Sequence, residues 1–156
     1  MKIIRKKRRR EKATNYLKRK KLLEGRKPRI VIRKSNKYLI IQYVESSLAQ
    51  DKVNYSVSSK DLLKKGWPKD KSGSLKSLGA CYLTGLLFGK KIIENKENKP
   101  MVLDTGLIRS TKGSRIYAAL KGIVDAGVKI EHNPDVFPDE KRVKVNGFFE
   151  EVKSKI

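Results

Sequence analysis

The sequence predicts an α/β fold: a small mixed β-sheet packed against helices, with a basic N-terminal arm before the sheet. Three observations support this class. Two β-branched runs flank a turn near residue 35, a long helical pattern covers residues 74–95, and residues 101–130 follow the order strand, loop, helix, strand. The 156 residues suggest one folded body. We expect an arm with a short helix at 1–25, a core at 26–131 and a C-terminal extension at 132–156.

The charge of the chain indicates a polyanionic partner. The formal net charge is +23, and residues 1–37 alone hold 18 Lys/Arg and only two acidic residues. Such an excess repels itself within a compact fold, so a nucleic acid is the natural reason for it. The single cysteine, Cys81, excludes an intrachain disulfide and fits a reducing compartment. No run is apolar enough to cross a bilayer, and no apolar segment follows the basic start as in a secretory signal. We therefore expect no membrane partner.

The N-terminal segment is predicted to be a nucleic-acid-binding arm followed by a helix. Residues 1–12 cannot bury enough apolar surface to order themselves alone, so they are either a solvated basic tail or an arm that orders on phosphate. A helix is expected from Thr14, as its N-cap, to Glu24, with Gly25 just past its end. Its apolar stripe is narrow, and cations surround most of the rest.

Three strands and a short helix are expected next. Residues 28–33 and 38–45 are rich in Ile and Val, and the turn between them, 33–37, carries three cations. This tip is either an ordinary charged turn or a phosphate contact. Residues 52–58 predict a third strand with Val53, Tyr55 and Val57 on one face, and Ser59 is expected to cap a short helix over 61–65. Trp67, beside the end of that helix, is expected to pack rather than to stack on a base.

The pattern at 74–95 predicts the longest helix. Besides its apolar stripe it carries small residues, Cys81, Gly85 and Gly89, spaced by four. Small side chains allow a sheet or another helix to approach closely. With no second cysteine and no nearby histidine, Cys81 is expected to be a small buried apolar residue rather than a nucleophile.

Residues 101–130 predict a βαβ-like unit with a phosphate-binding loop. The apolar run 101–103 resembles a buried strand, and Ile116, Ala119, Leu120, Ile123 and Val124 mark one face of a helix. Residues 109–115 place three cations and three hydroxyls at the start of that helix, where free N–H groups favour phosphate. Residue 127, a glycine, suits the left-handed end of the helix, and residues 128–130 resemble the next strand. The segment 136–156 is polar, and its last residues are either a docked helix or a fraying tail.

Enzymatic and metal-binding alternatives have little support. The triplet Asp104-Thr105-Gly106 occurs in aspartic proteases, where two carboxylates share a proton across a dimer axis. Those enzymes resemble all-β folds, whereas this chain has long helical patterns, so the triplet is expected to be a strand end and a turn. His132 is the only histidine, and Cys81 is the only cysteine. Because His132 has neither a nearby cysteine nor a second histidine beside it, we expect it not to belong to a zinc site. We expect no catalytic residue, no metal and no cofactor.

Several segments together resemble the universal 5S-rRNA-binding protein family of the large ribosomal subunit, protein eighteen in the bacterial count, in its archaeal/eukaryotic branch. The matching segments are TNY at 14–16, PR at 28–29 with VIRKSNK at 31–37, YLTGLL at 82–87 with GKK at 89–91, LD at 103–104 with GL at 106–107, and TKGSR at 111–115 with AALKG at 118–122. They occur in the family's order over most of residues 14–130. The stretch 69–77 and the tail after Val143 depart from the family pattern.

The resemblance implies a structural protein of the cytoplasmic ribosome. It implies an α/β sandwich in the central protuberance that binds 5S rRNA and the large rRNA beside neighbouring ribosomal proteins. The expected RNA-binding residues combine this carry-over with the charge pattern: Arg5, Lys6, Arg8, Arg9, Arg10, Asn15, Tyr16, Arg19, Lys20, Arg33, Lys34, Ser35, Asn36, Lys37, Arg109, Lys112, Gly113, Ser114 and Arg115. Tyr16 is the candidate for stacking on an unpaired base. We expect contacts mainly to phosphate and 2′-OH groups, with recognition by shape. A DNA-compacting protein is the main alternative, and an aspartic protease a remote one.

Overall fold

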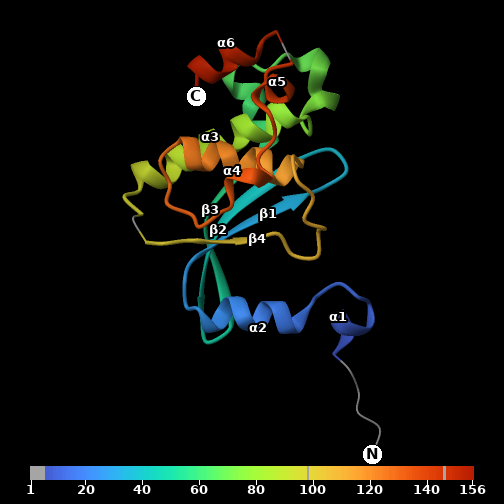
Figure 1. The fold of residues 1–156 in the computed structure, drawn as a ribbon, viewed down its shortest axis with the longest axis vertical. Helices are drawn as coiled ribbons and strands as arrows, with labels where there is room; N and C mark the ends of the chain where they lie inside the picture. Colours follow the sequence, from blue (N-terminus) through green and yellow to red (C-terminus); the bar gives the residue numbers. More distant parts are fainter. Residues whose placement is uncertain (1–5, 98, 146) are drawn as a thin grey trace, which may run out of the picture.

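The computed structural model describes residues 6–97, 99–145 and 147–156. Two helices precede three consecutive strands, a fourth strand lies between α3 and α4, and the last third of the chain is helical (Figure 1). The elements are α1 (Lys7–Arg10), α2 (Tyr16–Glu24), β1 (Arg29–Lys34), β2 (Leu39–Ser47), β3 (Gln50–Ser58), η1 (Ser59–Lys65), η2 (Lys69–Ser74), α3 (Leu78–Glu94), β4 (Val102–Asp104), α4 (Arg115–Asp125), η3 (Pro134–Val136), α5 (Glu140–Val143) and α6 (Phe149–Ser154).

The four strands form one mixed sheet in the order β3-β2-β1-β4. Strands β1, β2 and β3 pair antiparallel, whereas β4 runs parallel to β1. The β1–β2 ladder ends at the pair of Lys34 and Leu39, which places the predicted turn at the tip of the hairpin. The predicted mixed sheet is thereby confirmed.

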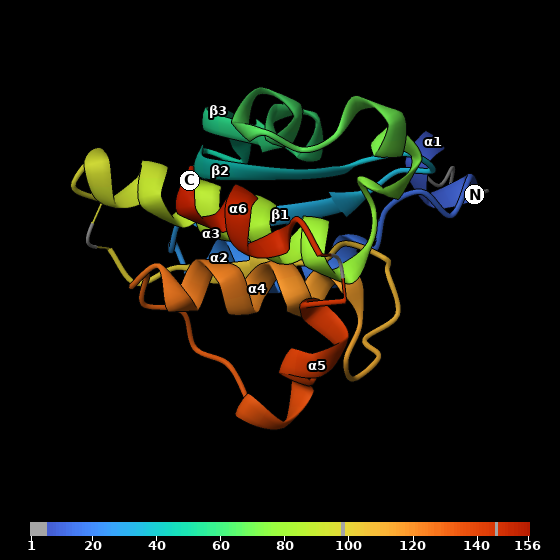
Figure 2. The same cartoon turned by 90° about the horizontal axis from the view of Figure 1, so that it is seen from above.

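Helices cover the sheet in two different ways. Helices α3 and α4 lie over one face, with α5 and α6 beyond them, and α2 lies on the opposite side (Figures 1 and 2). The core fills the space between the sheet and the α3–α4 layer, because alternate residues of β1 and β2 point there. Its members include Ile30, Ile32, Leu39, Ile41, Tyr43, Leu83, Phe88, Ile92, Leu120 and Ile123.

Glycines bring α3 and α4 into backbone contact. A Cβ on Gly85 would lie 2.0 Å from the carbonyl oxygen of Ala119, and one on Gly122 would lie 2.1 Å from that of Tyr82. No real Cβ tolerates such distances, so both glycines are required by the packing. The expected close approach along the small-residue stripe is confirmed. Cys81 is fully buried on the same helix, and burial raises the pKa of its thiol to about 12.

The end of the βαβ-like unit differs from the prediction. Gly127 has φ +103°, as expected for the left-handed end of α4. Residues 128–130, however, form no strand; Ile130 makes one isolated parallel bridge with Met101. The ladder goes no further: the Nδ1 of His132 lies 2.7 Å from the carbonyl oxygen of Ile130, and Pro134 then begins a 3₁₀ helix.

Two predicted helix caps are shifted by one residue. Asn15, not Thr14, caps α2, since its side chain accepts a hydrogen bond from the backbone N–H of Lys18 at 3.1 Å. Gly25 is still right-handed, and the left-handed conformation falls on Arg26, with φ +48°. The second shifted cap is that of η1. Ser58 caps this helix in a capping box with Asp61, whereas Ser59 is buried and accepts from the N–H of Leu39. Competing hydrogen-bond acceptors lie side by side in both places, and only the tertiary contacts select one.

A β-bulge breaks the predicted alternation of the third strand. The register passes from the pair Tyr43 and Tyr55 to the pair Val44 and Val53, which leaves Asn54 extra. One extra residue places the side chains before the bulge on the opposite face from the one that strict alternation with the residues after it would give. Val53 is therefore 48% exposed, whereas Val57 is buried, and the prediction of a shared face is wrong for Val53.

The C-terminal segment docks on the helical layer. Phe149 and Val152 of α6 are buried, which decides between a docked helix and a fraying tail. Phe148 packs edge-on against Trp67 with ring centroids 4.7 Å apart, so the expected packing role of Trp67 is confirmed.

The predicted long helix begins at Leu78 rather than near residue 74, because residues 69–74 form the 3₁₀ helix η2. Among the described helices, none is long and apolar enough to cross a membrane.

Candidate nucleic-acid interface

A buried ion-pair network organises the face of the sheet opposite α3 and α4. Val31 pairs with Asp104 across the parallel β1–β4 ladder, so Asp104 lies between Arg29 and Arg33, which share its face of the sheet. Its carboxylate accepts from Nη1 of Arg29 at 3.1 Å and from Nη2 of Arg33 at 3.2 Å. It also accepts from the backbone N–H of Gly106 at 2.7 Å. Two distant parts of the sequence, β1 and the end of β4, are thus joined.

These contacts give the Asp104-Thr105-Gly106 triplet a structural role. A proteolytic aspartate dyad needs a second carboxylate that shares a proton with the first. Asp104 instead contacts two guanidinium groups and is only 6% exposed. Gly106 provides the turn that follows β4, with φ +63°. The triplet is a strand end and a turn, as expected.

The network continues to helix α2. Arg29, itself 2% exposed, donates from Nη2 to Asp51 at 2.6 Å, and Arg19 of α2 donates to the other oxygen of Asp51 at 2.9 Å. Burial raises the pKa of Asp51, but the hydrogen bonds from Arg19 and Ser46 and the charges of both arginines outweigh it and lower the pKa overall. Ionised Asp51 therefore joins α2 to the sheet through Arg19 and Arg29.

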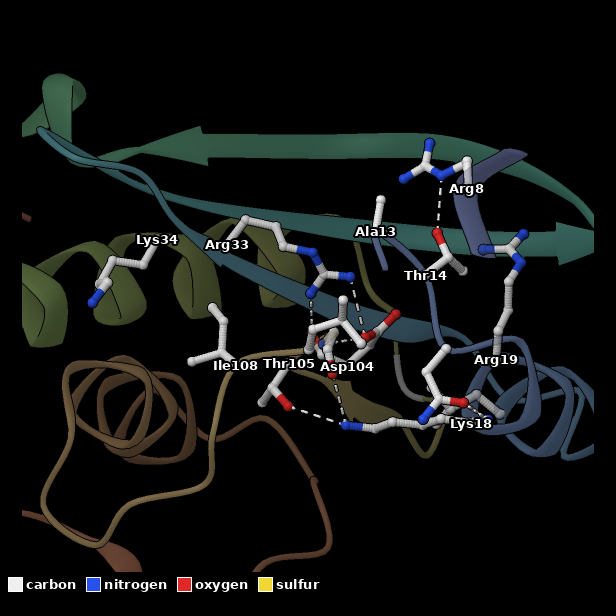
Figure 3. Close-up of a pocket in the computed structure, with 14 residues that line it drawn as sticks. Arg8, Ala13, Thr14, Lys18, Arg19, Arg33, Lys34, Asp104, Thr105 and Ile108 are labelled. Atoms are coloured by element: carbon white, nitrogen blue, oxygen red, sulfur yellow. Dashed lines mark hydrogen bonds and ion pairs between the residues drawn. The ribbon is translucent and has the colours of Figure 1, made fainter. Parts of the chain in front are cut away.

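Polar contacts tie α2 to the sheet and to the loop after β4. None of its residues is buried. Besides the Arg19 contact, Nζ of Lys18 donates to the carbonyl oxygen of Gly106 at 3.0 Å and to Thr105 Oγ1 at 3.4 Å. Between α2 and the loop after β4 lies a pocket of about 370 Å³, the arm pocket (Figure 3). Its cationic lining residues are Arg8, Lys18, Arg19, Arg33 and Lys34.

The predicted residues of the arm lie mostly in solvent. Lys6, Arg8, Arg9, Arg10, Asn15 and Lys20 are exposed, and Arg5 lies outside the described residues. Arg8 donates from Nε to Thr14 Oγ1 at 2.9 Å, which folds the arm back beside α2. Tyr16 is half-buried, with Nζ of Lys6 lying 5.0 Å from its ring centroid. A base that stacked on this face of Tyr16 would have to displace Lys6.

The hairpin tip divides into structural and exposed residues. Ser35 closes the turn, since its Oγ accepts from the N–H of Tyr38 and donates to the carbonyl oxygen of the same residue, both at 2.9 Å. Arg33 is held by Asp104, including a 2.7 Å hydrogen bond to its backbone oxygen. Lys34, Asn36 and Lys37 are exposed. The two lysines are therefore the cations of the tip that are most accessible to a ligand.

A second basic pocket lies at the start of α4. This α4 pocket has a volume of about 440 Å³ and is lined by Lys34, Leu78, Ile108, Arg109, Thr111, Gly113, Ser114, Arg115, Ile116 and Arg142. It adjoins the arm pocket, because Lys34 and Ile108 line both. The fold thus brings the hairpin tip, the loop and the arm to one surface. Lys112 is exposed but does not line the α4 pocket.

Sequence reasoning missed some lining residues of this surface. Arg142 of α5 lines the α4 pocket, and Lys18 and Thr14 line the arm pocket. The adjacent positions of Lys18 and Arg19 in the chain gave no hint that Lys18 binds the loop after β4 and Arg19 binds Asp51 of β3. Arg142 lies nearly thirty residues after the loop it faces, in a segment with no recognisable motif. Its only signal is a pair of cations in a short helix.

Comparison with known proteins places the chain among ribosomal proteins. The sequence model described as "Ribosomal large subunit proteins 60S L5, and 50S L18" matches residues 3–101 and 93–133. The chain is 47% identical over 137 residues to the large ribosomal subunit protein uL18 of Methanothrix thermoacetophila, covering 88% of this chain and 78% of that protein. It is 44% identical to uL18 of Korarchaeum cryptofilum, covering 88% and 68%, and 45% identical to uL18 of Methanococcoides burtonii, covering 88% and 76%.

These matches account for the features described above. The relatives are structural ribosomal proteins and not enzymes, which confirms the expectation of a non-enzymatic role. They are archaeal, in agreement with the branch that the resemblance indicated. A ribosomal constituent is surrounded by RNA, and a net charge of +23 suits that environment. The chain therefore belongs to the family of large ribosomal subunit proteins that comprises 60S L5 and 50S L18.

Proposed function

We propose that this protein binds 5S rRNA and helps to attach it to the large rRNA in the central protuberance of the ribosome. The observation that carries the proposal is the continuous basic surface formed by the arm pocket and the α4 pocket. The arm, the hairpin tip and the loop before α4 contribute to it. Neighbouring proteins of the central protuberance are the expected protein partners.

The surface suits folded RNA in shape and in chemistry. Lysine and arginine side chains from separate elements can each contact a different phosphate, and such contacts position a protein without reading base sequence. Folded RNA offers phosphates and 2′-OH groups at spacings that duplex DNA does not reproduce. A rigid body with several basic loops therefore discriminates by shape. The proposed contact residues remain those predicted from the sequence, with Lys34 at the junction of both pockets.

A competition experiment separates this function from DNA compaction. Labelled 5S rRNA bound to the protein is challenged with unlabelled 5S rRNA or with a DNA duplex of equal length. We expect 5S rRNA to compete at least about 100-fold better than the duplex. Affinity should also fall by about 1000-fold between 50 mM and 200 mM salt, since several counterions are released. Equal competition by DNA would favour the alternative, and a flat salt profile would contradict phosphate-led binding.

A matched pair of variants tests the location of the surface. Lys34→Gln removes the lysine that lines both pockets, and Lys90→Gln removes another exposed lysine, near the C-terminal end of α3. Lys90 lies twelve residues beyond Leu78, which lines the α4 pocket, and hence about 18 Å along the helix. We expect about 10-fold weaker 5S rRNA binding for the first variant and less than about twofold for the second. Equal losses would place the interface elsewhere.

A further inference from the structure

We infer that the α4 pocket is a discrete site for one backbone phosphate of the bound RNA, completed by Arg142 of α5. The inference rests on the proposed function and adds to it a specific group, a specific pocket and a residue outside the predicted RNA-binding set. Three independent features of the pocket support it: its charge, an unpaired hydroxyl and the geometry of the helix start.

The charge of the pocket is unbalanced. Lys34, Arg109, Arg115 and Arg142 line it, coming from β1, the loop before α4, α4 and α5, and its lining contains no acidic residue. Within the part of the chain that the structure describes, none of these four side chains forms an ion pair. The arm pocket, in contrast, includes Asp104, and a third pocket between α4 and α6 pairs Lys121 with Glu140. Four cations that converge without a counter-charge repel one another, and an anion removes that repulsion.

A buried hydroxyl in the pocket wall has no partner. The Oγ of Ser114 exposes less than 1 Å² and makes no hydrogen bond among the described residues. Ser114 occupies the N-cap position of α4 with the usual extended backbone, φ −75° and ψ 165°, but its side chain does not cap the helix. Buried polar atoms are nearly always paired, so this hydroxyl lacks a partner that the described chain does not supply. Rotation of the Ser114 side chain toward the pocket would let a phosphate oxygen provide it.

The start of α4 adds backbone donors. With no capping side chain, the N–H groups of Arg115, Ile116 and Tyr117 have no partner within the helix. They carry the positive end of the dipole of an eleven-residue helix. Gly113, with φ +66°, allows the loop to turn tightly, and a Cβ there would lie 3.3 Å from Nη1 of Arg142. The glycine therefore brings the Arg142 guanidinium next to the helix start, where one phosphate can contact both.

Arg142 provides the sharpest test, because a neighbouring residue is a matched control. Arg142→Gln and Lys141→Gln each remove one positive charge from an exposed position of α5, but only Arg142 lines the pocket. We expect Arg142→Gln to weaken 5S rRNA binding about 10-fold and to lower the slope of log affinity against log salt by about 0.7–0.9. Lys141→Gln should change the affinity by less than about twofold. Both variants should unfold like the parent protein, since neither side chain makes a described hydrogen bond or ion pair.

A second variant tests the hydroxyl. Ser114→Ala should leave the thermal unfolding midpoint of the free protein unchanged, because the hydroxyl has no partner to lose. It should weaken 5S rRNA binding by about 3- to 10-fold, because a phosphate oxygen loses a donor. A lowered unfolding midpoint without a change in RNA affinity would show that the hydroxyl caps the helix, and would overturn its role in the site.

The outcomes separate this inference from the proposed function. If the parent protein prefers 5S rRNA over duplex DNA but Arg142→Gln and Lys141→Gln bind it equally, the phosphate site is wrong and the proposed function stands. If the parent protein shows no preference for 5S rRNA, the proposed function fails and this inference fails with it. A selective loss for Arg142→Gln at low salt, with a reduced salt slope, supports both.

Discussion

Helices α3 and α2 are held to the same sheet by opposite kinds of contact. Helix α3 buries most of its residues against the sheet and α4, and its glycines allow backbone contact with α4. Helix α2 buries none of its residues and is joined to the sheet through Lys18, Arg19 and their acceptors. The first helix belongs to the core, whereas the second is a basic element fixed by charge.

This difference shows how one small chain can serve both as a rigid body and as an adaptable RNA ligand. Apolar packing of α3 excludes water and is insensitive to salt. The contacts of α2 are partly exposed ion pairs and hydrogen bonds, which salt weakens and which RNA phosphates can replace. The arm and α2 can thus adjust to the RNA without disturbing the core. Four predictions test this contrast, from the largest expected effect to the smallest.

Gly85→Ala should cause the largest loss of stability. The new Cβ would lie 2.0 Å from the carbonyl oxygen of Ala119, so α3 and α4 would have to separate. We expect the free energy of unfolding to fall by about 3–4 kcal/mol in chemical denaturation. Gly73→Ala is the control, since nothing lies within 4 Å of its Cβ position, and it should change the value by less than about 0.5 kcal/mol. Similar values for both variants would disprove the backbone contact.

A leucine in each helix compares the two regions directly. Leu83 of α3 is fully buried, whereas Leu17 of α2 is 67% exposed. Leu83→Ala leaves a cavity and should reduce the free energy of unfolding by about 3 kcal/mol. Leu17→Ala should reduce it by less than about 0.5 kcal/mol. If Leu17→Ala were as damaging as Leu83→Ala, α2 would be packed on the body by apolar contact, and the contrast would be lost.

Asp104→Asn should have an intermediate effect, because it removes the charge that joins Arg29 to Arg33. Breaking a buried ion pair leaves a charge without its partner, and Asn retains part of the hydrogen bonding. We expect a loss of about 2–3 kcal/mol in the free energy of unfolding. The control is Glu131→Gln, which breaks the surface ion pair between Glu131 and Lys27. The Glu131 side chain is 90% exposed, so the free energy of unfolding should fall by less than about 0.5 kcal/mol. Equal losses would mean that the network is no stronger than a surface ion pair.

Acidification should release α2 before it unfolds the core. Arg19 and Ser46 hold the pKa of Asp51 below its ordinary value of 3.8 despite the opposing effect of burial. Because the pKa of Asp51 is lower in the folded state than in the unfolded state, ionised Asp51 stabilises the fold fully above about pH 4. This stabilisation is lost as the pH falls through the lowered pKa. The protection of the α2 amides against hydrogen exchange, relative to their intrinsic rate at each pH, should therefore fall below pH 4, while α3 stays protected.

Asp51→Asn is the control for this pH dependence. It should cost about 1 kcal/mol in global stability and should make α2 exchange fast even at neutral pH. Acid-sensitive protection of α2 that persisted in Asp51→Asn would assign the effect to another carboxylate.

Local patterns in the sequence predicted the core correctly. The spacing of Cys81, Gly85 and Gly89 indicated a close helix contact, and the structure confirms it against Ala119. The Ile-rich runs and the charged turn predicted the β1–β2 hairpin, and Gly127 marks the left-handed end of α4. These features depend on neighbours within about eight residues, so the sequence contains the information.

Long-range polar contacts could not be predicted in this way. Arg29 contacts Asp104 across 75 residues, and the bulge at Asn54 turns Val53 outward. The cap of α2 depends on whether Asn15 or Thr14 is otherwise engaged, and Thr14 is taken by Arg8. Where two side chains could make the same hydrogen bond, the packing of distant segments selects one of them. A local sequence pattern contains no information about that packing.

The sequence alone determined that this chain is basic, forms an α/β fold and resembles a ribosomal family, because composition, periodicity and motif order are properties of the chain itself. Only the tertiary structure decided which cations are neutralised and which face a ligand. Arg33 is bound by Asp104, whereas Arg142 joins a pocket nearly thirty residues away in the chain. Electrostatic partners are set by distance in space, and folding creates those distances.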